Sequence, residues 1–292
     1  MKKTLIALAA VAVTSTAMAQ VTISGNLAFG FAGDTTNAGV STKGFGTDTS
    51  NLTFAASEDL GGGLPFKGSF SFENFAEDAA LAGTGTNLTL SGGFGSLNMS
   101  SDEGGDYLPI DGLTSNGNGT IGDRITYTSP AFNGLTVSVS QGDDIGVIDA
   151  DVGDTAGTTT SLSVTYANGP LTLNVISLDV NGTTAATMPG RTYAKVAYDL
   201  GVASVSYGII KSDLATDNTQ TGLSVTVPMG DLSFTAAHST SKADGGTSYS
   251  GNAFSASYAL SKRTKISYYN ESYQSTSTSN VKEYSLLLNH SF

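Results

Sequence analysis

Charged side chains gather between residues 101 and 122, a Gly-rich segment with no regular alternation. Its carboxylates are Asp102, Glu103, Asp106 and Asp111. Its apolar and aromatic side chains are Tyr107, Leu108, Pro109, Ile110 and Leu113. These are too apolar for a fully solvated loop, so we expect the segment to pack against another part of the protein. Carboxylates fixed in such a position attract cations, so they can select ions by charge without catalysing a reaction.

Catalysis has little support in the sequence. A hydrolase needs a histidine base beside a nucleophile or an activated water. The two histidines, His238 and His290, both fall on the apolar phase of alternating segments. We therefore expect no enzymatic activity, no catalytic residues and no cofactor.

A second acidic stretch raises the question of a metal site. Its aspartates are Asp143, Asp144, Asp149, Asp151 and Asp154. Carboxylates are ligands that Ca²⁺ prefers, but this spacing matches no EF-hand loop. We interpret the stretch as a solvated acidic loop, and we predict no metal site.

The first nineteen residues have the pattern of a secretory signal peptide. Lys2 and Lys3 precede an apolar stretch at 5–13, and Ala-Met-Ala at 17–19 supplies the small-x-small cleavage site. The apolar stretch is too short to cross a bilayer as a helix. We therefore divide the chain into a signal peptide, 1–19, and one domain, 20–292. Without the two lysines, 11 basic residues remain against 25 acidic ones, a formal charge of −14, which argues against nucleic acid as a partner.

Composition and periodicity together predict an all-β protein. The chain has 36 Gly, 6 Pro, 12 Tyr and 13 Phe, but no Trp and no Cys. Apolar residues recur at every second position along most of the chain, as in half-buried strands. The first such run contains Val21, Ile23, Leu27, Phe29 and Phe31. The last contains Tyr284, Leu286, Leu288, His290 and Phe292.

The polar phase of these strands favours a membrane barrel over a sandwich of two sheets. It consists mostly of Ser, Thr, Asn and Gly, which suit a water-filled lumen better than the charged surface of a soluble protein. Short Gly-rich turns are predicted at 58–63, 92–95, 131–134, 168–170, 200–202, 228–231 and 261–264. Longer polar stretches lie near 33–46, 76–85, 101–122, 143–158, 181–190, 212–218, 240–248 and 275–280. Their alternation predicts an antiparallel transmembrane barrel of about sixteen strands, wide enough for an aqueous channel.

The same alternation places four basic residues on the inner phase. They are Lys67, Arg124, Arg191 and Lys195. A charge facing lipid at the bilayer midplane would cost about 2–4 kcal/mol, so an inward orientation is expected. Rim salt bridges are the alternative for Arg191 and Lys195.

Several motifs, in the same order along the chain, resemble those of general porins of the β-proteobacterial type. They are SEDLGGGL at 57–64, KGSFSFE at 67–73, GFGSL at 93–97, ITYTSP at 125–130, YALSKRT at 258–264 and HSF at 290–292. The chain departs from the family at Ser101, where an arginine is usual, and residues 106–113 are closer to the pore loop of α-proteobacterial porins. The resemblance implies a homotrimer in the outer membrane whose third long loop folds into the lumen.

The predicted function is passive diffusion of ions and small hydrophilic solutes, with a moderate preference for cations. The resemblance implies that Asp102, Glu103, Asp106 and Asp111 narrow the pore opposite the basic wall. It also implies that the alternating last strand, with Tyr284 and Phe292, is read by the barrel insertion machinery before the barrel meets outer-membrane lipid. The alternatives are a solute-specific porin, for which inward Tyr193 and Tyr269 leave some room, and a closed barrel acting as an adhesin or anchor.

Overall fold

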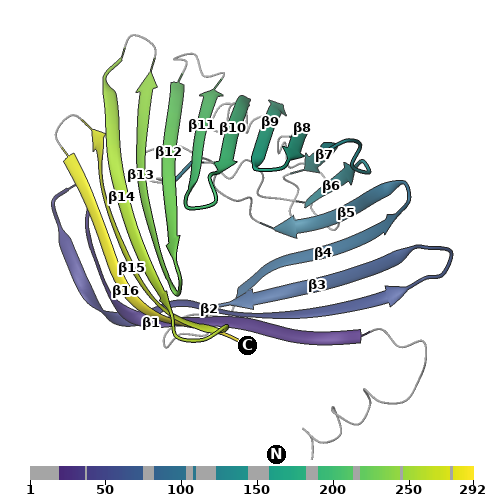
Figure 1. Cartoon of the computed structure of the whole chain (residues 1–292), viewed down its shortest axis with the longest axis horizontal. Coiled ribbons are helices and arrows are strands. Elements are labelled where there is room, and N and C mark those ends of the chain that lie inside the picture. The colour runs from purple at the N-terminus through teal and green to yellow at the C-terminus, as the bar shows by residue number, and fades with distance from the viewer. Residues whose placement is uncertain are drawn as a thin grey trace, which may run out of the picture.

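The computed structural model describes residues 20–36, 38–74, 82–102, 108–109, 123–143, 158–181, 190–212, 218–243, 246–276 and 279–292. These residues form sixteen antiparallel strands that close into one barrel, with β1 hydrogen-bonded to both β2 and β16 (Figure 1). Among them, no helix is long and apolar enough to cross a membrane. The predicted fold class and strand number are confirmed.

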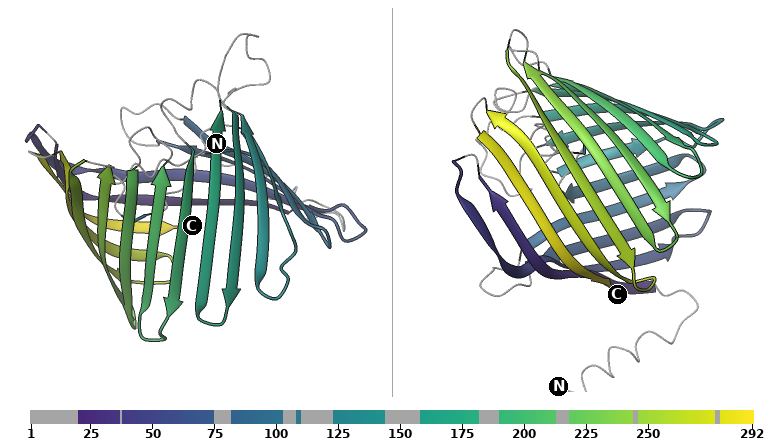
Figure 2. Two further views of the ribbon diagram at one scale, coloured as in Figure 1. Left: turned by 90° about the horizontal axis from the view of Figure 1, so that it is seen from above. Right: turned by 60° about the vertical axis from the view of Figure 1, so that its left-hand side comes forward.

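The first eight strands are β1 Gln20–Thr35, β2 Ser41–Asp59, β3 Pro65–Glu73, β4 Ala82–Gly92, β5 Gly95–Asp102, β6 Asp123–Thr128, β7 Leu135–Asp143 and β8 Thr158–Asn168. The second eight are β9 Leu171–Asn181, β10 Arg191–Asp199, β11 Ser204–Ser212, β12 Asn218–Met229, β13 Leu232–Ala243, β14 Ser248–Ala259, β15 Thr264–Thr276 and β16 Ser279–Ser291. Each strand pairs with its sequence neighbours, so the barrel is a simple up-and-down meander (Figure 2).

The predicted short turns lie at one rim of the barrel. Gly61, Gly62 and Gly63 between β2 and β3 all have positive φ, which is the conformation that only glycine adopts without strain. Gly95 begins β5 with φ 105°, and a Cβ there would stand 2.1 Å from the carbonyl oxygen of Thr128 on β6. These glycines allow a tight reversal and a close approach of two backbones.

Three of the predicted long loops are much shorter than expected. The polar stretches near 33–46, 240–248 and 275–280 are mostly strand, leaving only 36–40, 244–247 and 277–278 as connections. Thr35 pairs with Ser41, and the turn is closed by the Thr36 amide, which donates to the Val40 carbonyl at 2.9 Å. The ladder of backbone hydrogen bonds continues where side-chain alternation fades, because the backbone groups pair whatever the side chains are.

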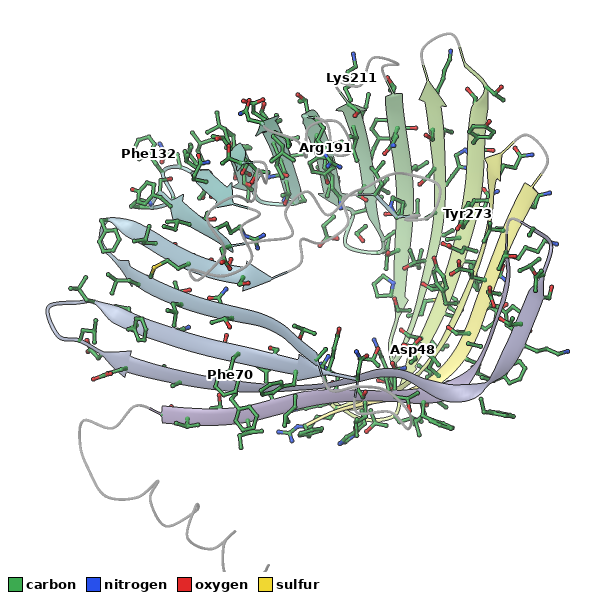
Figure 3. The ribbon with its side chains drawn as sticks, turned by 180° about the vertical axis from the view of Figure 1, so that it is seen from behind. Asp48, Phe70, Phe132, Arg191, Lys211 and Tyr273 are labelled. Atoms are coloured by element: carbon green, nitrogen blue, oxygen red, sulfur yellow. The ribbon has the colours of Figure 1, made fainter. Side chains whose placement is uncertain are left out.

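The two faces of the wall differ in polarity, as predicted. Large apolar side chains stand exposed on the outer face, for example Val21, Phe70 and Phe45, the last 80% exposed. On the inner face, small polar side chains form hydrogen bonds across strands, for example between Thr53 Oγ1 and Ser71 Oγ, which are 2.9 Å apart. Side chains project from both faces in Figure 3. The protein is therefore a polar tube with an apolar exterior, which is the reverse of a soluble domain.

Candidate functional site

The four basic residues predicted to face inward do lie on the inner phase of their strands. Their register partners are mainly small polar wall residues, for example Ser57 and Thr89 beside Lys67, and Asn174 and Gly208 beside Lys195. On the opposite phase of β6 and β10 the side chains are exposed and apolar or aromatic, such as Ile125 and Tyr198. These strands face lipid on one side only, and a charge on that side would be unfavourable, so the basic side chains face the lumen.

The basic residues occupy different heights of the wall. Lys67 lies two residues after the start of β3, near the rim of short turns. Arg124 and Arg191 lie at the other rim, as the second residue of β6 and the first of β10. Arg191 is only 6% exposed, whereas Lys67 is exposed. Arg124 and Arg191 therefore lie near the rim of long loops, Lys195 lies midway along β10, and Lys67 stands apart near the rim of short turns.

The predicted acidic face of the pore loop falls mostly outside the described residues. Asp102 ends β5 on the inner phase, where it pairs with Gly85. Nothing is described of its side chain, or of Glu103, Asp106 and Asp111. The aspartates from 144 to 154 also lie outside the described part of the chain.

Two residues of the connection between β5 and β6 are described, and both contact the inner wall. Leu108 is 4% exposed and packs against Tyr193 on β10 and Ile210 on β11. Pro109 approaches Gly222 on β12. The connection therefore enters the lumen at this point, as the apolar character of the segment predicted.

An acidic wall on β15 and β16 was not singled out from the sequence. Glu271 and Glu283 are direct cross-strand partners, and both face inward. Glu271 is 5% exposed, and the Tyr269 hydroxyl donates a hydrogen bond to its Oε2. The signal was present in the alternation of Tyr269, Glu271 and Tyr273, which share one face of a strand.

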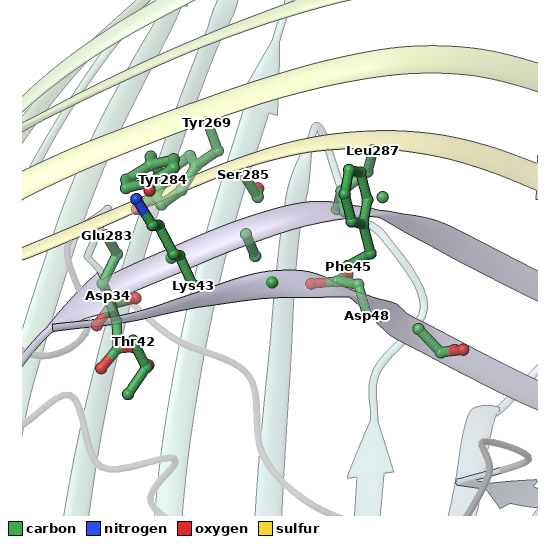
Figure 4. A pocket seen from close by; sticks show the side chains of 16 residues that line it. Asp34, Thr42, Lys43, Phe45, Asp48, Tyr269, Glu283, Tyr284, Ser285 and Leu287 are labelled. Carbon is green, nitrogen blue, oxygen red and sulfur yellow. The ribbon is translucent and has the colours of Figure 1, made fainter.

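Beside this acidic pair the wall is hollowed into a recess of about 620 Å³ (Figure 4). Asp34, Thr42 and Glu283 lie at one end of the recess, and Asp48 and Leu287 at the other. The Thr42 hydroxyl donates to Asp34. Four glycines of β1 and β2, Gly30, Gly33, Gly44 and Gly46, are among the residues that line the recess.

The acidic and basic walls lie on opposite sides of the barrel. In the closed order of strands, β8 is halfway round from β16. The basic residues of β6 and β10 flank that far side, and Glu271, Glu283 and Asp34 lie on β15, β16 and β1. Opposite charges on facing walls produce a field across the lumen, directed from the basic to the acidic side.

The remaining predicted residues lie on the outer phase. His238 contacts Asn252 at 2.9 Å, and His290 contacts Thr264 at 2.9 Å, both with Nδ1 and both exposed. Tyr284 packs its ring on Phe31 at the seam, with centroids 6.2 Å apart. Neither histidine faces the lumen. Among the described residues no group of three or more acidic or histidine side chains is placed to hold a metal.

A closed barrel with an apolar exterior and a charged, polar interior defines a pore-forming protein of the membrane. A family model described as Gram-negative porin matches residues 4–280. The chain belongs to this family, and it is an outer-membrane porin that forms a channel.

Solved structures show the same fold at low sequence identity. The anion-selective porin from Comamonas acidovorans matches with a TM-score of 0.77 and 19% identity, covering 94% of this chain and 100% of that one. A mutant of the Rh. blastica porin matches with a TM-score of 0.70 and 13% identity, with coverage of 94% and 100%. A loop-deletion mutant of OmpT, an outer membrane protein of Vibrio cholerae, matches with a TM-score of 0.68 and 13% identity, with coverage of 94% and 99%. A search among curated proteins finds no match.

Proposed function

We propose that this porin is a passive diffusion channel for ions and small hydrophilic solutes, with a moderate preference for cations. The polar inner wall carries the proposal. Side chains such as Asn174, which donates to Ser163 and Thr165, offer a hydrated surface without a continuous set of aromatic rings. Such a surface selects by size and fixed charge and needs no cofactor and no catalytic residue.

The preference for cations rests on charge. The whole chain carries a formal −12, and we expect the carboxylates Asp102, Glu103, Asp106 and Asp111 to face the lumen. Glu271 and Glu283 add carboxylates to the wall. The solved relative from Comamonas acidovorans is described as anion-selective, but at 19% identity the similarity extends to the fold alone.

The opposed walls add a second element to the mechanism. A field between Arg124, Arg191 and Lys195 on one side and Glu271 and Glu283 on the other orients a dipolar solute as it passes. Orientation favours solutes that carry separated charges over apolar solutes of the same size. The lumen between these walls therefore screens by polarity as well as by size.

We propose further that the channel works as a homotrimer with residues 1–19 removed. The closed barrel leaves no free strand edge, so protomers associate through their outer faces in the plane of the lipid. The alternating β16 with Tyr284 and Phe292 serves as the signal to the barrel insertion machinery. An enzymatic role is not proposed.

Recordings from planar lipid bilayers test the channel proposal. The purified protein in KCl should give large, ohmic conductance steps. In a KCl gradient, the sign of the zero-current potential should show that K⁺ permeates more readily than Cl⁻. A current blocked by one class of solute would favour a solute-specific porin instead. Absence of conductance from correctly folded protein would favour a closed barrel acting as an adhesin or anchor.

A further inference from the structure

We propose that a cross-strand pair of glycines, Gly208 and Gly222, is the seat that holds Leu108 and Pro109 against the inner wall. The seat would set how far the connection between β5 and β6 projects into the lumen, and thereby the conductance. This inference rests on the proposed diffusion function. Gly208, Gly222, Leu108 and Pro109 are thus positioning residues for the channel.

The geometry of the pair leaves room for nothing larger than hydrogen. Gly208 on β11 and Gly222 on β12 are direct partners on the inner phase. A Cβ on Gly222 would lie 2.5 Å from Cδ of Pro109 and 3.2 Å from Cδ2 of Leu108. A Cβ on Gly208 would lie 2.9 Å from the same Leu108 methyl. The two glycines therefore form one hollow, and both residues of the connection occupy it.

The contact excludes water from a part of the wall that faces a hydrated lumen. Leu108 is 4% exposed, Tyr193 4% and Ile210 1%. Inner-wall residues of β11 and β12 nearer the short turns, such as Ser206 and Ser224, are only half-buried. This burial stabilises Leu108 in its position, because moving it would expose apolar surface of both Leu108 and the wall to water.

Solvent is also excluded from the wall around the seat, on β12 and on the next strand, β13. Gln220 pairs with Ile210 and is 2% exposed, and Ser239 pairs with Gly222 and is fully buried. Gln220 Oε1 and Ser239 Oγ have no hydrogen-bond partner. Buried polar atoms without partners are unfavourable, so the burial of these two atoms is a cost that packing around the seat must offset.

Substituting Gly222 tests the seat, and the chain supplies a matched control. Gly222→Ala must open the contact to Pro109 from 2.5 Å to at least 3.4 Å, which moves the connection toward the lumen axis. Gly44→Ala adds the same methyl group to the inner phase of β2, where nothing lies within 4 Å. We expect a lower single-channel conductance for Gly222→Ala than for the wild type and for Gly44→Ala.

A compensating substitution distinguishes a clash with Pro109 at the seat from a general effect of the added methyl group on the wall. Pro109→Ala removes Cγ and Cδ, two of the three atoms that a Cβ on Gly222 would meet, including the nearest one. The double variant Gly222→Ala/Pro109→Ala should therefore recover most of the lost conductance, and the two substitutions should be non-additive. Where Gly222→Ala does not assemble, Gly208→Ala replaces it, with the same comparison to Gly44→Ala.

A cross-link tests the contact itself. The chain contains no cysteine, so Pro109→Cys/Gly222→Cys can be oxidised without background and followed by a reducible shift on gels of unfolded protein. We expect a cross-link for this pair and none for Pro109→Cys/Gly44→Cys. A conductance of Gly222→Ala equal to that of Gly44→Ala, a failure of Pro109→Ala to restore it, or an absent cross-link would each overturn the proposal. A wild type that conducts normally would leave the diffusion function standing in all three cases.

Discussion

The ring of Phe292 lies against Gly25, where the last residue of the chain meets the first strand. The Gly25 amide donates to the Phe292 carbonyl at 3.1 Å, and the Phe292 amide donates to the Gly25 carbonyl at 3.0 Å. A Cβ on Gly25 would lie 2.6 Å from Cζ of the ring. This pair extends the register of β1 and β16, which begins at Asn26 and Ser291, and it seals the closing seam on the outer face.

Deleting Phe292 should therefore impair assembly at the seam. The change removes the two backbone hydrogen bonds to Gly25 and the ring that covers it, while the segment 1–19 expected to direct secretion stays intact. We expect much less heat-modifiable, protease-resistant barrel in the outer membrane and an undiminished amount of exported chain. Phe132→Ala, at a 74% exposed ring in the turn before β7, is the control. Wild-type amounts of inserted barrel after deletion of Phe292 would contradict the prediction.

The fold could be predicted from the sequence because the membrane fixes one face of each strand as apolar. Val21, Ile23 and Phe29 on β1 show this alternation plainly, and all three are exposed on the outer face. Strand ends were harder to place. Around Thr35 and Ser41 the side chains are small or polar on both phases, so nothing in the pattern indicates that the ladder of hydrogen bonds continues.

Tyr269 offers a test of the acidic wall. Its hydroxyl donates to Glu271, a carboxylate that is 5% exposed. Tyr269→Phe removes this donor and should lower the free energy of unfolding by about 1.5–3 kcal/mol, the usual contribution of a hydrogen bond to a charged group. The measurement is thermal unfolding in detergent, followed by circular dichroism. Tyr207→Phe, at a ring on the outer face of β11 that is 45% exposed, is the control and should change little. Equal stability of the two variants would show that the Tyr269 bond contributes nothing.

The oligomer can be measured directly. We expect a trimer in mild detergent that dissociates to monomers on heating, because the closed barrel has no free strand edge and must associate through its outer face. Light scattering with correction for bound detergent gives the protein mass. A monodisperse monomer under several mild conditions would rule out a stable trimer.

The site could be predicted only in part, and the reason lies in distance along the chain. Inward positions such as Lys195 and Arg124 follow from alternation within one strand. The pairing of Glu271 with Glu283 depends on the register between two strands, and the seating of Leu108 on Gly208 depends on a contact across 100 residues. Alternation gives the face of a residue but not its partner on another strand.

The last prediction concerns ion selectivity. We expect the acids of the connection between β5 and β6, Asp102, Glu103, Asp106 and Asp111, to place negative charge in the lumen. Arg124, Arg191 and Lys195 on the inner wall oppose it, and two of them lie on β10, the strand whose Tyr193 contacts Leu108. Fixed charge in a narrow channel concentrates counterions, so we expect K⁺ to be favoured moderately over Cl⁻.

Neutralising the four acids together, with Asp→Asn and Glu→Gln, should move the zero-current potential in a KCl gradient toward the anion side. The preference of the wild type should weaken as salt rises, because the Debye length is about 10 Å at 0.1 M and shortens to about 3 Å at 1 M. The matched control neutralises the same number of acids in the 144–154 stretch, Asp144, Asp149, Asp151 and Asp154, and should shift the potential less. A wild-type channel that already prefers Cl⁻ would show that the basic wall outweighs the loop, and a control with an equal shift would show that total charge, rather than the pore loop, sets the selectivity.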